Sequence, residues 1–258
     1  MTETKKTLPQ LRQEIDVIDL EIIASLQKRA GIVKEVGTHK RGDKAIAGNR
    51  FIQAAREADM LRNILAKEDV YHPAIITAIW RAIISGSLLL EEDLDIAILT
   101  DDISASGLAI EYFTRAYQIT SYLDISELTK RMLNQEHKIL VISTRQLAQM
   151  QDLSFTEKLV AAGINIFAQL PLISGDSLPE ALAFSKIELQ KSQQDKTIFY
   201  ASKIVDFDQE LFAKEYQIIS SNKNDLIFSK DGFAADKKIG KFEKFLLNIT
   251  QIGGFAKF

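Results

Sequence analysis

The feature that most constrains this chain is a long, uninterrupted helical pattern near its N-terminus. Thr7 and Gln10 have the spacing of a capping box, and Pro9 lies in the first turn, where proline is tolerated. The pattern continues to Lys40, which predicts a helix roughly 50 Å long at about 1.5 Å per residue. Its apolar stripe consists of Leu11, Ile15, Ile18, Ile22, Leu26, Ile32, Val33 and Val36.

A helix of this length does not fit inside a small domain. A compact domain of about 95 residues has a diameter of only roughly 30 Å, so one end of the helix would protrude with its apolar stripe uncovered. A second copy of the chain is the simplest cover, and we therefore expect a homodimer.

The composition of the 258 residues limits the classes of function. A net charge of -3 gives no basic field, which argues against non-specific nucleic-acid binding as the main activity. The chain has no cysteine, so disulfides, zinc-thiolate sites and thiol nucleophiles are excluded. The N-terminus is polar, and we find no run of about 18 apolar residues, so we expect a cytoplasmic protein without a membrane partner.

The hydrophobic pattern changes from helical to mixed near Glu92, which predicts two domains, 1–94 and 95–258. In the first domain a loop is expected at 41–52, a second helix at 53–67, and a third from His72-Pro73 to about Glu92. The second domain should be α/β and two-lobed, with a closing crossover. Its predicted buried strands are 95–99, 138–143, 164–170 and 196–202.

Charged residues share helix faces with apolar ones in the first domain. Arg29, Val33, Val36 and Lys40 fall on one stripe of the first helix. A second stripe, on the third helix, contains Trp80, Ile84, Ser87 and Glu91.

A single charge at a helix end is usually a solvated side chain. A whole set at the edge of an apolar bundle costs several kcal/mol per charge unless an anion lies between them. Arg56 and Glu57, at the start of the second helix, could join the same space. We therefore predict an anion site inside the bundle.

Helix geometry limits the ligand of that site. The Cα atoms of Arg29 and Lys40 should lie about 16 Å apart, which leaves room for a small dianion between their side chains. Arg12 lies about 42 Å from Lys40 along the same helix. It can serve such a site only from a partner chain, so the site should be shared across the dimer.

The first 95 residues resemble the all-helical (type II) chorismate mutases, including the mutase part of bifunctional mutase/dehydratase enzymes. The resemblance rests on LRQEIDVIDLEIIASLQKRAGIVKEVGTHK, RFIQAAREADMLRNIL and IWRAIISGSLLLEE, in this order. It implies an intertwined dimer of three-helix chains that rearranges chorismate to prephenate in phenylalanine and tyrosine biosynthesis. The reaction is pericyclic and implies neither a cofactor nor a metal.

The resemblance also implies roles for individual residues. Arg12 would reach into the partner's site, while Arg29 and Arg56 would bind the carboxylates of the substrate. Lys40 would contact a carboxylate and the ether oxygen, and Glu91 would face Lys40 across the breaking bond.

The remaining roles complete the expected site. Glu57 would hold the ring hydroxyl and Ser87 would help to position the substrate. Gln53 stands where the family usually has aspartate, and many relatives have glutamine where this chain has Glu91.

The second domain follows the mutase in the order expected of a prephenate dehydratase, but the Thr-Arg-Phe segment of that family is missing. Thr114-Arg115 is followed by alanine and Thr144-Arg145 by glutamine. No glycine-rich dinucleotide fingerprint is present either. We therefore expect a degenerate, non-catalytic dehydratase-like domain. The alternatives are a bifunctional mutase/dehydratase, an isochorismate-pyruvate lyase and a non-enzymatic dimeric sensor.

Overall fold

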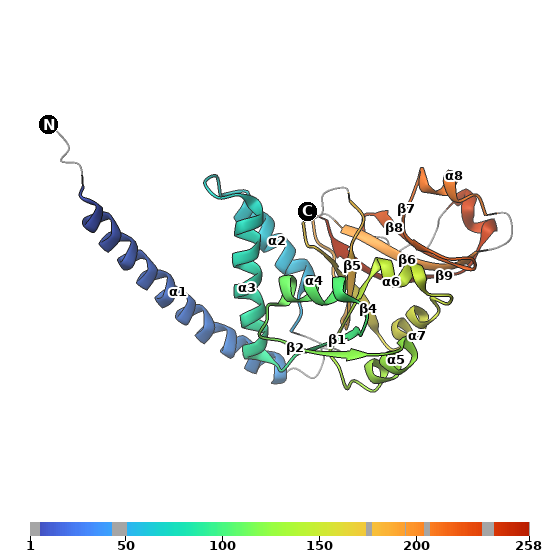
Figure 1. Ribbon diagram of the computed structural model, residues 1–258, viewed down its shortest axis with the longest axis horizontal. Coiled ribbons are helices and arrows are strands. Elements are labelled where there is room, and N and C mark those ends of the chain that lie inside the picture. The colour runs from blue at the N-terminus through green and yellow to red at the C-terminus, as the bar shows by residue number, and fades with distance from the viewer. Residues whose placement is uncertain are drawn as a thin grey trace.

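The computed structural model describes residues 6–42, 51–173, 177–193, 195–203, 207–233 and 240–257. A helical region is followed by a region built around one sheet (Figure 1). The helical region consists of α1 (Leu8–Gly42), α2 (Ala54–Leu65) and α3 (Pro73–Glu91). All three predicted helices are present. The predicted loop lies mostly at 43–50, outside the described residues.

Helix α1 begins where the capping pattern places it. The Thr7 amide donates to Oε1 of Gln10 at 2.8 Å, as a capping box requires. The helix extends away from the rest of the molecule (Figure 1), in agreement with the length argument. All of its large apolar side chains except Val33 are between 37% and 67% exposed: Leu8, Leu11, Ile15, Val17, Ile18, Leu20, Ile22, Ile23, Leu26, Ile32 and Val36.

Helix α3 is the most apolar helix of the bundle. His72 caps its N-terminus, with Nδ1 accepting from the Ala74 amide at 3.2 Å, and Pro73 opens the first turn. By length and composition α3 could span a membrane, with a mean hydropathy of 1.6. No such apolar segment was expected from the sequence, so that expectation is wrong for α3. The same test is passed by core helices of soluble proteins, and seven α3 residues, including Ile84 and Leu88, are buried.

Within the described residues the sheet has nine strands, in the order β2-β1-β3-β5-β4-β9-β6-β8-β7. The four predicted strands correspond to β1 (Asp95–Leu99), β3 (Ile139–Ser143), β4 (Ile164–Leu170) and β6 (Asp195–Lys203). Five further strands were not predicted: β2 (Gln118–Tyr122), β5 (Ala181–Lys186), β7 (Gln217–Ser221), β8 (Asp225–Asp231) and β9 (Leu246–Ala256).

Strand β9 provides the closing crossover. It lies between β4 and β6, parallel to the first and antiparallel to the second, and so joins both halves of the sheet. Gly253 pairs with Ile166 at a φ of +155°, and a Cβ at this position would lie 2.4 Å from the Ile166 carbonyl oxygen. Only glycine permits so close an approach of β9 to β4.

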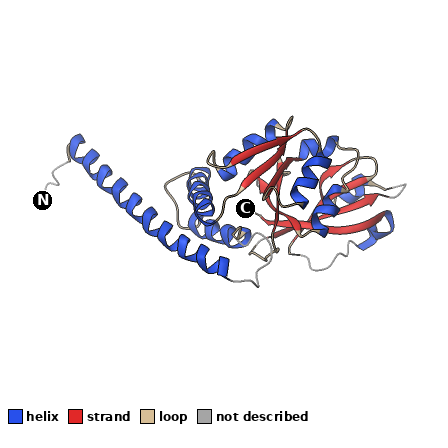
Figure 2. Cartoon of the chain, turned by 90° about the horizontal axis from the view of Figure 1, so that it is seen from below, coloured by secondary structure: helices blue, strands red, loops and turns tan. Residues whose placement is uncertain are grey.

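Helices cover both faces of the sheet (Figure 2). They are α4 (Ile103–Phe113), α5 (Ile125–Leu133), α6 (Thr144–Gln149), α7 (Phe155–Ala161), α8 (Gln209–Ala213) and the 3-10 helix η1 (Gly240–Phe245). Alternate residues of β1 enter different cores, because successive strand side chains point to opposite faces. Ile96 and Ile98 contribute to one core, whereas Ala97 and Leu99 contribute to the other.

The helical region shares the first of these cores with the sheet. Phe51, Ile52, Ile84 and Leu88 belong to the same buried cluster as Ile96 and the α4 side chains. Helices α2 and α3 therefore pack on the sheet region beside α4, and this packing fixes the wall of the cleft described next.

Candidate active site in the helical bundle

A cleft of about 450 Å³ opens between α1, α2 and α3. This volume lies within the roughly 300–1,000 Å³ typical of small-molecule sites. Most of its exposed wall surface is apolar, although nine of the sixteen lining residues are polar or charged. It is lined by Ser25, Lys28, Arg29, Ile32, Val33, Val36, Lys40, Phe51, Gln53, Arg56, Glu57, Met60, Ile84, Ser87, Leu88 and Glu91.

Seven of the eight site residues expected from the sequence line this cleft. Helix α1 contributes Arg29 and Lys40, which lie about three turns apart on the predicted stripe. The start of α2 and the residue before it contribute Gln53, Arg56 and Glu57, and α3 contributes Ser87 and Glu91. Trp80, placed on the same face of α3 by its spacing, is not among the lining residues.

Lys40 and Glu91 join α1 to α3 at the end of the cleft. Nζ of Lys40 lies 2.9 Å from Oε2 of Glu91, and both side chains are largely buried, at 17% and 8% exposure. Lys40 also lies 5.4 Å from the centroid of the Phe51 ring, a cation–π contact. A carboxylate thus partly neutralises the lysine inside the cleft.

Gly37 allows α1 and α3 to meet at this point. It is buried, and a Cβ added to it would lie 3.3 Å from Cγ of Glu91. On the next turn, Nη1 of Arg41 donates to the backbone carbonyl of Glu91 at 2.7 Å. The last turn of α3 is therefore held directly by α1.

Arg29 is fixed against α3 as well. Its Nη1 donates to Oγ of Ser87, whose hydroxyl donates in turn to the Ile83 carbonyl at 2.7 Å. The serine is used to orient a guanidinium, so the arrangement binds and positions anions rather than activating a nucleophile.

Glu57 has a partner that the sequence analysis missed. Nη1 of Arg81, on α3, lies 2.8 Å from Oε2 of Glu57, and the Arg81 side chain is only 4% exposed. Burial lowers the pKa of Arg81, but Tyr112 and the carboxylate of Glu57 outweigh it, and the net shift is upward. The available signal was one charge inside the apolar run IITAIWRAII.

Arg12 lies apart from the cleft of its own chain. It is exposed on the projecting part of α1, about 42 Å from Lys40 by helix rise. Lys28, Phe51 and Met60 line the cleft although the sequence analysis did not select them. Lys28 adds a cation beside Arg29, and the other two supply apolar wall.

Together these residues define a class of site. Arg29, Arg56 and Lys28 bring positive charge to an apolar cleft, while both lining carboxylates are already paired with cations. Such a cleft can hold a small molecule that carries carboxylates and can fix its conformation.

Comparison with known protein families identifies one that has a site of this class. Residues 11–92 match the family model of chorismate mutase type II. The resemblance seen in the sequence is therefore confirmed for this part of the chain, and the family that it matches is one of isomerases.

The whole chain was also compared with curated proteins and with solved structures. No curated protein sequence matches it significantly. Among solved structures it is similar to prephenate dehydratase from Streptococcus mutans, with 12% identity and a TM-score of 0.37 over 64% of this chain and 98% of that chain. It is also similar to GqqA, described as a novel type of quorum quenching acylase, with 7% identity and a TM-score of 0.39 over 64% and 95%.

Proposed function

We propose that this protein rearranges chorismate to prephenate in the cleft between α1, α2 and α3. The observation that carries the proposal is the convergence of Arg29, Lys40 and Arg56 on one cleft, within the segment that matches the chorismate mutase family. The reaction is intramolecular: one carbon–carbon bond forms while the carbon–oxygen bond of the ether breaks, and no proton is transferred.

The site lowers the barrier by orientation and by electrostatics. Arg29 and Arg56 bind the two carboxylates and hold the substrate in its compact, reactive conformation. Lys40 stabilises the negative charge that develops on the ether oxygen as its bond to carbon breaks. Arg29 and Lys40 lie about three turns apart on α1, so the two tasks fall to different parts of the cleft.

The other polar residues complete the positioning. Glu57 accepts a hydrogen bond from the ring hydroxyl, Ser87 keeps Arg29 in place, and Gln53 contributes a neutral amide beside the substrate. Glu91 faces the ether oxygen next to Lys40. The pairing with Lys40 offsets the repulsion between this carboxylate and the charge that develops on the ether oxygen.

We propose that the working unit is a dimer with shared sites. The apolar face of α1 is exposed along the part of the helix that extends away from the molecule, and a second copy of α1 presents the same apolar face. In such a dimer Arg12 of each chain can enter the cleft of the other. There its guanidinium can pair with a carboxylate of the substrate.

We further propose that residues 1–94 form the mutase domain and that 95–258 form a non-catalytic domain. Thr114 lies at the end of α4 with a φ of +72° and its following residues are Arg115 and Ala116, while Oγ1 of Thr144 donates to the Pro179 carbonyl at 2.9 Å. Neither threonine belongs to a Thr-Arg-Phe segment. We place the enzyme in the cytoplasm, with chorismate as its ligand and neither nucleic acid nor membrane as a partner.

The decisive experiment follows the loss of chorismate absorbance with purified protein. Arg29→Ala and Lys40→Ala should each slow the reaction by about a hundredfold or more. Lys34→Ala is the matched control, because Lys34 is exposed on the same helix and does not line the cleft.

Three outcomes would contradict the proposal. They are a wild-type protein that leaves chorismate unchanged, a Lys40→Ala variant with full activity, and equal losses in Lys40→Ala and Lys34→Ala. Parallel assays for pyruvate from isochorismate and phenylpyruvate from prephenate identify a lyase or a dehydratase instead.

A further inference from the structure

We propose that Arg81 is a positioning residue for Glu57, and that the sheet region holds Arg81 in place through Tyr112. The mutase site is then completed by a part of the chain that lies outside the mutase domain. This inference rests on the proposed function, because it concerns how Glu57 is presented to chorismate.

The contacts of Arg81 lead in two directions. Toward the cleft, Nη1 lies 2.8 Å from Oε2 of Glu57. Toward the sheet region, Nε donates to the Tyr112 carbonyl at 3.3 Å, and the guanidinium carbon lies 3.7 Å from the centroid of the Tyr112 ring. Arg81 therefore bridges a cleft carboxylate and α4, which packs beside α3 (Figure 1).

Tyr112 is a fixed support for the guanidinium. Its carbonyl also accepts from Oγ of Ser85 at 3.1 Å, and the hydroxyl of Tyr117 donates to the Ser85 carbonyl at 3.1 Å. The ring contacts Phe113 edge to face at 4.7 Å between centroids. Burial raises the pKa of Tyr112 to about 12, so its ring stays neutral at physiological pH.

The buried cation restricts what Glu57 can do. If the carboxylate rotated away, Arg81 would be left charged and unpaired in a site where it is 4% exposed, which is strongly unfavourable. Nη2 of Arg81 is buried and has no hydrogen-bond partner among the described residues, so the pairing with Glu57 is its main electrostatic compensation.

The same pairing leaves part of Glu57 available to a ligand. Oε2 is held by Arg81, whereas among the described residues Oε1 accepts only a long hydrogen bond of 3.4 Å from the backbone N–H of Gln53. An ionised carboxylate has about four acceptor positions, so Oε1 can still accept from a substrate hydroxyl. Arg81 thus fixes the rotamer of Glu57 without occupying its binding capacity.

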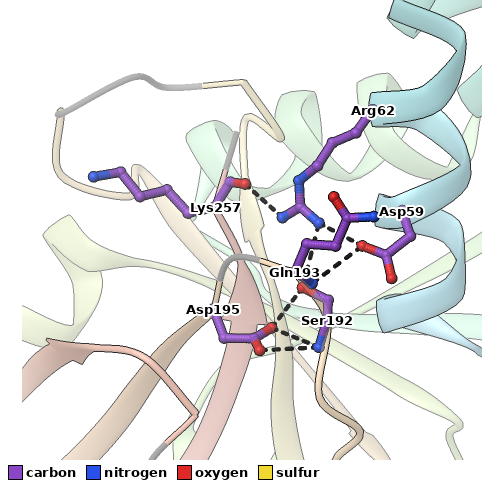
Figure 3. Close-up of polar contacts among 6 residues, drawn as sticks. All are labelled: Asp59, Arg62, Ser192, Gln193, Asp195 and Lys257. Atoms are coloured by element: carbon purple, nitrogen blue, oxygen red, sulfur yellow. Dashed lines mark hydrogen bonds and ion pairs between the residues drawn. The ribbon is translucent and has the colours of Figure 1, made fainter. Parts of the chain in front are cut away.

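Helix α2, which carries Glu57, is also anchored to the sheet region at its far end (Figure 3). Nη2 of Arg62 donates to the Lys257 carbonyl at 2.6 Å, and Nη1 donates to Oγ of Ser192 at 3.3 Å. Oδ1 of Asp59 accepts from Arg62 at 2.7 Å and from the Gln193 amide at 3.2 Å. The sheet region therefore constrains both the position of α2 and, through Arg81, its catalytic-site carboxylate.

A double-mutant cycle tests the inference through kcat and KM for chorismate. Arg81→Met and Glu57→Gln should each lower kcat/KM by about tenfold or more, and the double variant should be no worse than Glu57→Gln alone. Arg81→Lys keeps a cation for Glu57 and should recover at least about threefold over Arg81→Met. Losses that multiply in the double variant would overturn the inference, because Arg81 would then act independently of Glu57.

Folding is monitored by circular dichroism and thermal melting. If Arg81→Met does not fold, Tyr112→Leu takes its place in the cycle because it removes the ring under the guanidinium, and Tyr112→Phe, which keeps that ring, is the control. Tyr112→Leu should lower kcat/KM only while Glu57 is present, and an equal loss in the Glu57→Gln background overturns the inference.

The two proposals fail in different ways. A wild-type protein without chorismate turnover overturns the proposed function and the positioning role together. If chorismate turnover requires Lys40 but the losses of kcat/KM in Arg81→Met and Glu57→Gln multiply in the double variant, only the positioning role is overturned.

Discussion

Nζ of Lys40 and Oε2 of Glu91 lie 2.9 Å apart, at the place where Gly37 lets α1 and α3 approach each other. Lys40, which we propose stabilises the transition state, is thus held by a residue of another helix. Its position therefore depends on the spacing of the two helices. Small changes in that spacing should alter catalysis more than stability.

The first prediction concerns Gly37. In Gly37→Ala the new Cβ would lie 3.3 Å from Cγ of Glu91 and displace it, so we expect chorismate turnover to fall about tenfold. The free energy of unfolding should change by less than about 1 kcal/mol, because alanine is the better helix former. Gly31→Ala is the matched control, with no atom within 4 Å of its new Cβ. Equal activity in both variants would show that the helix contact does not set the geometry of Glu91.

The second prediction concerns the charge of Glu91. A carboxylate repels the charge that develops on the ether oxygen, whereas the amide of Glu91→Gln is neutral and can donate to it. We therefore expect Glu91→Gln to keep at least the wild-type kcat for chorismate, while Glu91→Ala, which leaves no polar group facing the ether oxygen, should lose about tenfold or more. The check is kcat and KM for the three proteins, and a Glu91→Gln variant as impaired as Glu91→Ala would refute this role.

The third prediction concerns the shared site. Arg12→Ala and Arg29→Ala should each be nearly inactive as homodimers. When the two are mixed and allowed to exchange subunits, about half of the dimers are hybrids, and each hybrid has one complete site, so about a quarter of wild-type activity should return. No recovery after verified exchange would mean that Arg12 does not act in the partner's cleft.

The fourth prediction concerns the exposed stripe of α1. Ile18 is 53% exposed, and Ile18→Asp places a charge on the surface that a second copy should cover. We expect sedimentation to show weaker dimers and the specific activity to fall at low protein concentration. Gln27→Asp adds the same charge at an exposed position outside the apolar stripe and should stay dimeric. A wild-type protein that is already monomeric and fully active would exclude the shared site.

The fifth prediction concerns alkaline stability. Burial raises the pKa of Tyr112 from 10.0 to about 12, so between these values the folded protein keeps a proton that the unfolded chain releases. Stability is therefore unaffected below about pH 10 and decreases above it, by up to about 1.4 kcal/mol per pH unit for this residue. Denaturant unfolding of Tyr112→Phe should show a shallower decrease, and identical slopes for the two proteins would refute the assignment.

Much of the helical region could be predicted because one physical signal dominates it. A 3.6-residue period places Arg29 and Lys40 on one face, and the fixed rise of a helix separates Arg12 from both. The capping signals at Thr7 and at His72-Pro73 then fix where α1 and α3 begin.

The sheet region was predicted less completely because its unpredicted strands lack a clear pattern. Strand β2 reads QITSY and is largely solvent-exposed or intermediate in burial, and β9 contains Gly253 and Gly254, which usually indicate a loop. The central position of β9 depends on pairing with β4 and β6, which are distant in sequence.

Arg81 illustrates a different limit. The sequence places Arg81 inside an apolar helix. Its role, however, depends on Glu57 in another helix and on Tyr112 in the sheet region. No local pattern connects residues that meet only after the two regions have packed together.

The common core of the two regions has a consequence for the chain as a unit. Phe51, Ile52 and Leu88 are buried against side chains such as Ile96. Cutting the chain near Leu94 would therefore expose apolar surface on both fragments. Neither fragment should be an autonomous protein, and the full chain should melt in a single cooperative step. Substitutions that destabilise the sheet would then also lower the catalytic activity of the cleft between the helices.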